Sequence, residues 1–243
     1  MYLVDERLNS VPESEIEKAE KRLGISLPQG YKNFVTTYGV GTFCGFLVIP
    51  SPTEISKFSM NFRWNSGTDV LNEEMAKGAY QIASTIDADV IIFCPKSEKG
   101  IYVLPRHSDS IFWIDENFRD PSVWFSKNGI ERNSEPLKYF EPLVERDFIE
   151  LRANNSFSLI DETISCIEKE FNIKYKVIHR RYDDVDLIFV KEMAAMIEVS
   201  RSGDYIRFDF HPSKEFVFFK LISTLEVKGL VPRARACYLR IPS

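Results

Sequence analysis

The segment between residues 16 and 46 constrains the fold of this chain most, because it joins two amphipathic helices and then enters a strand. The apolar residues of the first helix recur at spacings of three and four and share one face: Ile16, Ala19 and Leu23. Gly24 is expected to end this helix. Leu27-Pro28 is expected to open the next one, since proline disfavours a helical residue before it.

The second helix presents an aromatic face and ends at closely spaced glycines. The residues of that face are Tyr31, Phe34, Val35 and Tyr38. Gly39 and Gly41 are expected to stop the helix, and the apolar run 43–49 that follows predicts a strand. The chain therefore begins with two helices packed by their apolar faces and continues into a sheet.

The remainder of the first 151 residues predicts a helix, a group of strands and a closing helix. The strands are expected at 90–94, 101–104 and 111–114, with short polar turns between them. Such short connections are typical of an antiparallel meander rather than a βαβ alternation. Modest periodicity predicts a helix over 71–84, and the apolar spacing of FEPLVERDFIEL predicts another over 140–151. Trp113 lies in an alternating strand and is expected in the core.

A second pattern begins after the polar stretch 152–156. It predicts, in order, a helix over 157–171, strands over 174–179, 185–191, 194–200 and 205–210, and a last helix over 213–228. The predicted fold class is α+β: an antiparallel sheet with packed helices, followed by a second small α+β domain. The expected domains are 1–151 and 152–229, with a tail over 230–243.

The tail begins with Leu230-Val231-Pro232-Arg233, which matches a thrombin-cleavage linker of expression vectors. The residues after it continue no periodicity. Two interpretations remain open, a vector-derived extension and a natural basic extension.

The charge of the chain favours a protein partner over a nucleic acid. The formal net charge is −5, whereas nucleic-acid binding requires a basic face. Residues 1–150 carry 16 basic and 23 acidic side chains (−7), and residues 151–243 carry 15 and 13 (+2). The first part is therefore the one that attracts a cationic partner. No signal peptide or membrane-spanning run is recognisable, so a cytoplasmic protein without membrane contact is expected.

The sequence contains no catalytic or cofactor motif. Its four cysteines are widely spaced, and Cys44 and Cys94 lie in apolar runs typical of buried thiols. His107-Ser108-Asp109 cannot form a catalytic relay, because the base of such a relay must lie between its two partners. No cofactor and no metal are expected, and the chain is expected not to be an enzyme.

Acidic side chains flanking the predicted strands are the candidate binding residues. They form an acidic face if the sheet brings them together: Asp87, Asp89, Asp115, Glu116 and Asp120. Trp64, in the polar stretch NFRWNSG, is the candidate aromatic contact, because interfaces favour tryptophan.

The stretch IEKAEKRLGISLPQGYKNFVTTYGVGTFCG resembles the SUKH superfamily. The pattern is a charged helix, LG, LP, Y-K-x-F and a YGxG-like turn into a strand. The matching residues are Leu23, Gly24, Leu27, Pro28, Tyr31, Lys32, Phe34, Tyr38, Gly39 and Gly41. VIIFCPKSEKGIYVL is similar to the paired strands of that family and FEPLVERDFIEL to its final helix, so that the resemblance covers about residues 10–151.

The resemblance implies an α+β fold and a non-catalytic function. Members are bacterial immunity proteins, which bind and neutralise a polymorphic or contact-dependent toxin, and fungal regulators of cell-wall glucan synthesis. The motif residues are implied to be structural rather than partner contacts. Three hypotheses follow: an immunity protein for a toxin of the nuclease type, a regulatory or scaffolding protein, and an enzyme using Asp183, Asp184, Asp186 or His211 of the second domain.

Overall fold

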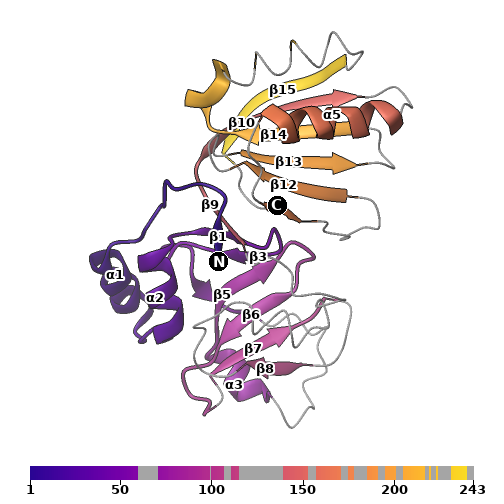
Figure 1. The fold of residues 1–243 in the computed structure, drawn as a ribbon. Helices are drawn as coiled ribbons and strands as arrows, with labels where there is room; N and C mark the ends of the chain where they lie inside the picture. The colour runs from indigo at the N-terminus through magenta and orange to yellow at the C-terminus, as the bar shows by residue number, and fades with distance from the viewer. Residues whose placement is uncertain are drawn as a thin grey trace. The chain divides into compact units, whose positions relative to one another are not determined.

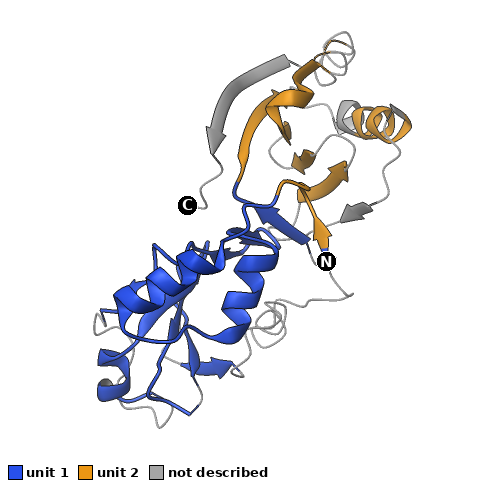
Figure 2. Ribbon diagram, turned by 90° about the vertical axis from the view of Figure 1, so that its left-hand side faces the viewer, with its two compact units in different colours: residues 1, 8–143, 241–243 blue, residues 2–7, 144–240 orange. Residues whose placement is uncertain are grey.

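The computed structural model divides the chain into two compact units. Leu8–Leu143 make up nearly all of unit 1, and Tyr2–Arg7 with Val144–Arg240 make up unit 2 (Figure 2). The structure describes residues 1–59, 71–98, 100–106, 111–114, 139–152, 157–170, 175–177, 185–190, 195–200, 205–216, 219, 223 and 231–239. The boundary expected at residue 151 falls within unit 2, at the end of a strand.

Unit 1 opens with the two predicted helices, α1 (Glu13–Leu23) and α2 (Gln29–Thr37) (Figure 1). Ile16 and Ala19 are the buried residues of α1, as the spacing predicts. Gly24 ends α1 in the left-handed conformation at φ 69°, which glycine adopts without steric cost. Pro28 lies immediately before α2 and has an extended backbone.

The sheet of unit 1 is built from short strands. They are β2 (Gly41–Phe43), β3 (Leu47–Ile49), β4 (Ser56–Lys57), β5 (Tyr80–Thr85), β6 (Val90–Phe93), β7 (Ile101–Leu104), β8 (Phe112–Ile114) and β9 (Tyr139–Pro142). Within the unit their order is β9-β2-β3-β5-β6-β7-β8, with β4 also paired to β5. These pairings are antiparallel, which confirms the predicted fold class.

The run 43–49 forms a hairpin rather than the single predicted strand. Cys44 and Gly45 both have positive φ, 50° and 61°, and the amide of Phe46 donates to the carbonyl of Phe43 over 3.0 Å. Two consecutive left-handed residues are typical of a tight turn whose twist matches that of the flanking strands. The turn separates β2 from β3.

The helix predicted over 71–84 is wrong. The chain instead forms the short helix α3 (Glu73–Lys77), capped by Asn72, and then β5. A register shift between Gln81 and Ala83 interrupts the alternation of β5, so both Ile82 and Ala83 are buried. A bulge of this kind places buried residues three apart, which imitates a helical period.

The helix predicted over 140–151 is also wrong, and with it the likeness of FEPLVERDFIEL to a final helix. These residues form β9 and then β10 (Glu145–Arg152). Ile149 and Leu151 are buried with a spacing of two, and Phe148 and Glu150 are half-buried on the other side. The apolar residues Val144 and Phe148 are four positions apart, which is also the spacing of residues on one face of a helix.

The expectation that Trp113 is a core residue is wrong as well. The Trp113 residue is 39% exposed, whereas its neighbour Ile114 is buried. Trp113 lies on β8, which has one strand neighbour, β7, among the described strands. A residue at the edge of a sheet receives less cover than one on a central strand, which accounts for the exposure.

Unit 2 pairs one helix with a second antiparallel sheet. Helix α5 (Phe157–Glu170) lies along this sheet (Figure 1), whose order is β11-β12-β13-β14-β10-β15. The additional strands are β11 (Tyr175–Val177), β12 (Val185–Val190), β13 (Ala195–Ser200), β14 (Tyr205–Phe210) and β15 (Val231–Leu239). The predicted helix over 157–171 and the four predicted strands are confirmed among the described residues.

Two segments join unit 2 that the sequence pattern does not place there. Strand β1 (Tyr2–Leu3) belongs to the segment Tyr2–Arg7, from the other end of the chain. Residues 231–239, which lie in the predicted tail, form β15 and pair with β10 from Glu145 to Arg152. Of the last predicted helix the structure describes only parts, beginning with the 3₁₀ turn η2 (Pro212–Lys214).

Candidate functional site

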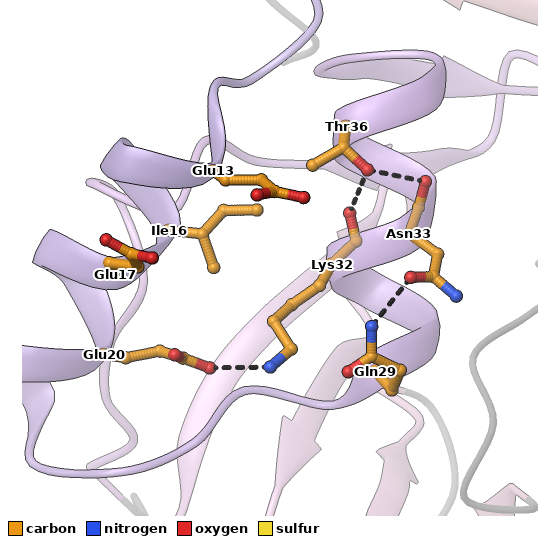
Figure 3. Close-up of a pocket in the computed structure, with 8 residues that line it drawn as sticks. All are labelled: Glu13, Ile16, Glu17, Glu20, Gln29, Lys32, Asn33 and Thr36. Atoms are coloured by element: carbon orange, nitrogen blue, oxygen red, sulfur yellow. Dashed lines mark hydrogen bonds and ion pairs between the residues drawn. The ribbon is translucent and has the colours of Figure 1, made fainter.

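One hollow of unit 1 is a groove between α1 and α2. Its volume is about 220 Å³, and its walls come from both helices (Figure 3). The lining residues are Glu13, Ile16, Glu17, Glu20, Gln29, Lys32, Asn33 and Thr36. Helix α1 contributes the carboxylates and one apolar residue, Ile16, and α2 contributes amides, a hydroxyl and one cation.

A carboxylate on α1 fixes the end of the groove that is closest to the α1–α2 connection. Glu20 Oε1 accepts from the Leu27 amide over 2.8 Å and from Lys32 Nζ over 3.1 Å. Ser26 Oγ donates to the same oxygen over 3.3 Å. Burial raises the pKa of Glu20, but the Leu27 amide and the Lys32 ammonium outweigh it and lower the pKa overall.

The other carboxylates of the groove carry uncompensated charge. Glu13 and Ile16 project from α1 toward α2, whereas Glu20 meets Lys32 (Figure 3). No ion pair joins Glu13 or Glu17 to another residue that the structure describes. Thr36 Oγ1 donates to the Lys32 carbonyl over 2.9 Å, and Gln29 donates to Asn33 over 2.8 Å. The groove is therefore a polar, net acidic surface.

The helices are anchored to the sheet by the residues of the sequence motif. Tyr31 is fully buried, and its hydroxyl donates to the Pro50 carbonyl over 2.8 Å. Phe34 packs edge-on against Phe140 of β9, with ring centroids 5.3 Å apart, and also against Tyr38. Leu27 is buried, and the Leu23 carbonyl accepts from the Tyr80 hydroxyl.

The two glycines of the turn lie where the backbone comes very close to another backbone segment. At Gly39, with φ 85°, a Cβ would lie 2.2 Å from the carbonyl oxygen of Asn9. At Gly41 a Cβ would lie 2.1 Å from the carbonyl oxygen of Glu141 on β9. Neither position has room for a side chain, so both residues serve the architecture of the turn.

Only part of the predicted acidic face lies among the described residues. Asp87 and Asp89 belong to the β5–β6 turn, and both are half-buried. Asp89 Oδ1 accepts from the amide of Arg106 over 2.8 Å, which ties this turn to the end of β7. Asp115, Glu116, Asp120 and Trp64 lie outside the described residues, as do His107-Ser108-Asp109, Asp183 and Asp184.

Unit 2 contains a buried charged group that sequence reasoning missed. Asp5 and Arg146 are 2% and 1% exposed, and their side chains lie 3.7 Å apart. Arg7 pairs with Asp5 over 2.5 Å. On β14, Arg207 pairs with Asp209 and lies over the Phe148 ring, 4.3 Å from its centroid. No sequence signal links Asp5 to Arg146, which lie far apart along the chain.

His211, a residue of the enzyme hypothesis, lies in this charged environment. Its Nδ1 accepts the Ser213 amide over 3.2 Å. Desolvation lowers the pKa of His211, and the charge of Arg7 lowers it further. Asp186 lies on β12 and is half-buried. Among the described residues, no group of three or more His, Cys, Asp or Glu side chains is placed to hold a metal ion.

The helix pair, the glycine turn and the antiparallel sheet make the amino-terminal unit an α+β domain. Comparison with protein families agrees: the family model SUKH_6, described as SMI1-KNR4 cell-wall, matches residues 13–121, somewhat less than half of the 243-residue chain. Residues 13–121 are thus similar to the SUKH superfamily. Searches of curated proteins and of solved structures gave no match.

Among the described residues, no helix is both long enough and apolar enough to cross a membrane.

Proposed function

We propose that this chain is an immunity protein that binds a cognate bacterial toxin domain and neutralises it by direct contact. The match of residues 13–121 to the SUKH superfamily carries the proposal, because immunity proteins and cell-wall regulators make up that superfamily. The toxin domain is of the nuclease type, the chain itself is not an enzyme, and binding takes place in the cytoplasm.

Charge supports a basic partner. Glu13 and Glu17 line the groove between α1 and α2, and residues 1–150 carry a balance of −7. A nuclease that binds a polyanion needs a basic cleft, and an acidic surface both occludes such a cleft and accelerates the encounter. The proposed contact surface therefore includes the rim of the groove, in addition to the acidic positions predicted from the sequence.

The acidic residues of the proposed contact surface are not equally suitable for testing an electrostatic interface. Asp89 also holds a turn through the Arg106 amide, so its reversal to lysine would disturb folding as well as binding. Glu13 and Glu17 are exposed helix residues, and their reversal leaves the buried face of α1 intact. They are the sharper positions at which to test an electrostatic interface.

A regulatory protein is the second candidate, because the matching family model carries the description SMI1-KNR4 cell-wall. A scaffold of that kind would bind several unrelated partners and would not require a toxin gene beside its own. Affinity purification from the native cell distinguishes the two candidate functions. An immunity protein should be recovered with one dominant toxin partner, and a scaffold with several unrelated proteins.

Co-expression tests the proposal. The open reading frame immediately upstream is expressed under an inducible promoter, with and without this chain, and growth is followed. The proposal predicts survival with the wild-type chain and reduced protection by the double variant Glu13→Lys, Glu17→Lys. Glu15→Lys is the matched control, because Glu15 is exposed on the same helix but does not line the groove. Equally rapid death with and without the chain refutes the proposal.

A further inference from the structure

The walls of the groove between α1 and α2 are two matched helix faces. On α1 the lining residues recur at positions i, i+3, i+4 and i+7, and they are Glu13, Ile16, Glu17 and Glu20. On α2 the same spacing is repeated by Gln29, Lys32, Asn33 and Thr36. Residues at this spacing lie on one side of a helix, so each helix turns a single face to the other (Figure 3).

Contacts between the helices hold the groove in place at both ends. At the end closest to the α1–α2 connection, Lys32 reaches Glu20 over 3.1 Å. At the other end, the chain entering α1 is bonded to the last turn of α2. The Val11 amide donates to the Val35 carbonyl over 3.0 Å, and Ser10 Oγ donates to the Thr37 carbonyl over 3.4 Å. The groove is therefore a preformed surface, which lowers the cost of binding.

The groove offers acceptors at the end away from Lys32. Glu13 lies in the first turn of α1 and projects toward α2 (Figure 3). Thr36 Oγ1 donates its hydrogen to the Lys32 carbonyl over 2.9 Å, so the lone pairs of this hydroxyl still accept. The last turn of α2 contains no basic residue, although a helix carboxyl terminus favours cations. A ligand for this end must therefore be a cation that donates hydrogen bonds.

The size and floor of the groove suit one long side chain. Its volume is about 220 Å³, and small-molecule sites usually measure about 300–1,000 Å³. Ile16, which is 4% exposed, forms an apolar floor between the polar rims. Arginine and lysine combine an apolar stem with a cationic head. Arginine fits better, because its planar fork donates in several directions and because interfaces favour arginine and disfavour lysine.

We propose that the groove between α1 and α2 seats one arginine side chain of the bound partner. The guanidinium donates to the Glu13 carboxylate on one wall and to the Thr36 hydroxyl on the other. The arginine stem lies over Ile16, and Glu17 adds negative charge at the exposed rim. The inference rests on the proposed function for the identity of the partner, a basic toxin domain, and adds the chemistry of one contact.

A blocked amino acid tests this arginine seat without any toxin. N-acetyl-arginine amide is titrated into the full chain labelled with ¹⁵N, and the backbone amide resonances are followed. We expect saturable shifts confined to residues 13–36, with a dissociation constant in the millimolar range, since a single side chain has few atoms to contribute. N-acetyl-lysine amide should bind at least about threefold more weakly, and the neutral isostere N-acetyl-citrulline amide should not bind.

Three variants separate a defined seat from diffuse attraction. The double variant Glu13→Gln, Glu17→Gln should weaken binding of the arginine probe by at least about fivefold. Glu15→Gln is the matched control and should change it by less than about twofold, because Glu15 is exposed in the same first turn but does not line the groove. Thr36→Val keeps the shape and the charge of the wall and should weaken binding by about threefold, the effect of one hydrogen bond.

The outcomes distinguish this inference from the proposed function. The absence of saturable shifts, or equal binding of the lysine or citrulline probe, overturns the arginine seat. An equal loss in Glu15→Gln, or unchanged binding in Thr36→Val, leaves only diffuse charge and also overturns it. Protection in the co-expression test without arginine binding would remove the seat and keep the immunity function. Arginine binding without protection would keep the seat and remove that function.

Discussion

The carboxylate of Glu20, near the end of α1, accepts the amide of Leu27 over 2.8 Å and thereby fixes the connection into α2. The same oxygen meets the ammonium of Lys32 on α2. One side chain therefore closes the loop, orients the second helix and forms one end of the groove. This relationship explains why the two helices present a defined surface.

Loss of the Glu20 carboxylate should destabilise unit 1. We expect Glu20→Ala to lower the free energy of unfolding by about 1–2 kcal/mol, because the Leu27 amide and Lys32 lose their charged partner. Glu17→Ala, at an exposed position of the same helix, should change it by less than about 0.5 kcal/mol. Urea denaturation of both variants measures the difference, and equal effects would contradict this role of Glu20.

The effect of Glu20 should depend on pH. Because the folded chain lowers the pKa of Glu20, the carboxylate stabilises the fold above its unfolded pKa of about 4.3, and this contribution is lost as the pH falls through the folded value. The stability difference between wild type and Glu20→Ala should therefore be constant from pH 7 to pH 5.5 and should narrow toward pH 3. A difference that widens on acidification has the wrong sign for this account.

The glycines at the two helix ends should differ in their tolerance of alanine. Both have positive φ, but a Cβ at Gly24 meets nothing within 4 Å, whereas at Gly39 it would lie 2.2 Å from the Asn9 carbonyl oxygen. Gly24→Ala should cost about 1–2 kcal/mol, the conformational penalty alone. Gly39→Ala should cost clearly more, because the backbone must also shift. Thermal unfolding of the two variants measures which is less stable. A larger loss of stability in Gly24→Ala than in Gly39→Ala would contradict the close approach of Gly39 to Asn9.

The turn residue Asp89 should tolerate asparagine better than alanine. Its Oδ1 accepts the Arg106 amide over 2.8 Å, and the amide oxygen of asparagine can replace that acceptor. Asp89→Ala should lower the free energy of unfolding by about 1 kcal/mol and Asp89→Asn by much less. Chemical denaturation distinguishes them. Equal losses would show that the charge of Asp89, rather than its hydrogen bond, matters to the fold.

Cys94 should be unreactive while the chain is folded. Burial raises the pKa of its thiol to about 12, and the thiolate is the reactive form. Iodoacetamide at pH 8 followed by peptide mapping should label Cys94 slowly in buffer and rapidly in urea. Cys166 is only partly buried and serves as the internal comparison. Rapid labelling of Cys94 in buffer would contradict its burial, which the sequence predicts from its apolar surroundings.

The ends of the first two helices were predictable from the sequence, because glycine and proline constrain the backbone directly. Gly24 and Pro28 stand at the expected helix ends. The strands β5 and β10 were not predictable by periodicity. The bulge near Ile82 and the four-residue apolar spacing that begins at Val144 both produce the sequence pattern of a helix. Only pairing with distant strands decides between helix and strand at these positions.

The groove and the buried charges could not be predicted from the sequence. Lys32 belongs to the recognised motif, but its partner Glu20 carries no signal beyond being one of several acidic residues on α1. Asp5 and Arg146 are separated in the sequence by Leu8–Leu143, and their pairing depends on tertiary structure alone. The role of Trp64, Asp115, Glu116 and Asp120 as contacts stays a prediction.

The affinity between this purified chain and a catalytically inactive form of the toxin domain encoded beside it tests the central claim most directly. Calorimetric titration should give saturable binding that weakens with added salt and weakens strongly in the variant Glu13→Lys, Glu17→Lys, with little change in Glu15→Lys. Saturable binding that none of these reversals alters would move the interface away from the groove. The absence of any binding to that toxin domain would contradict the immunity function itself.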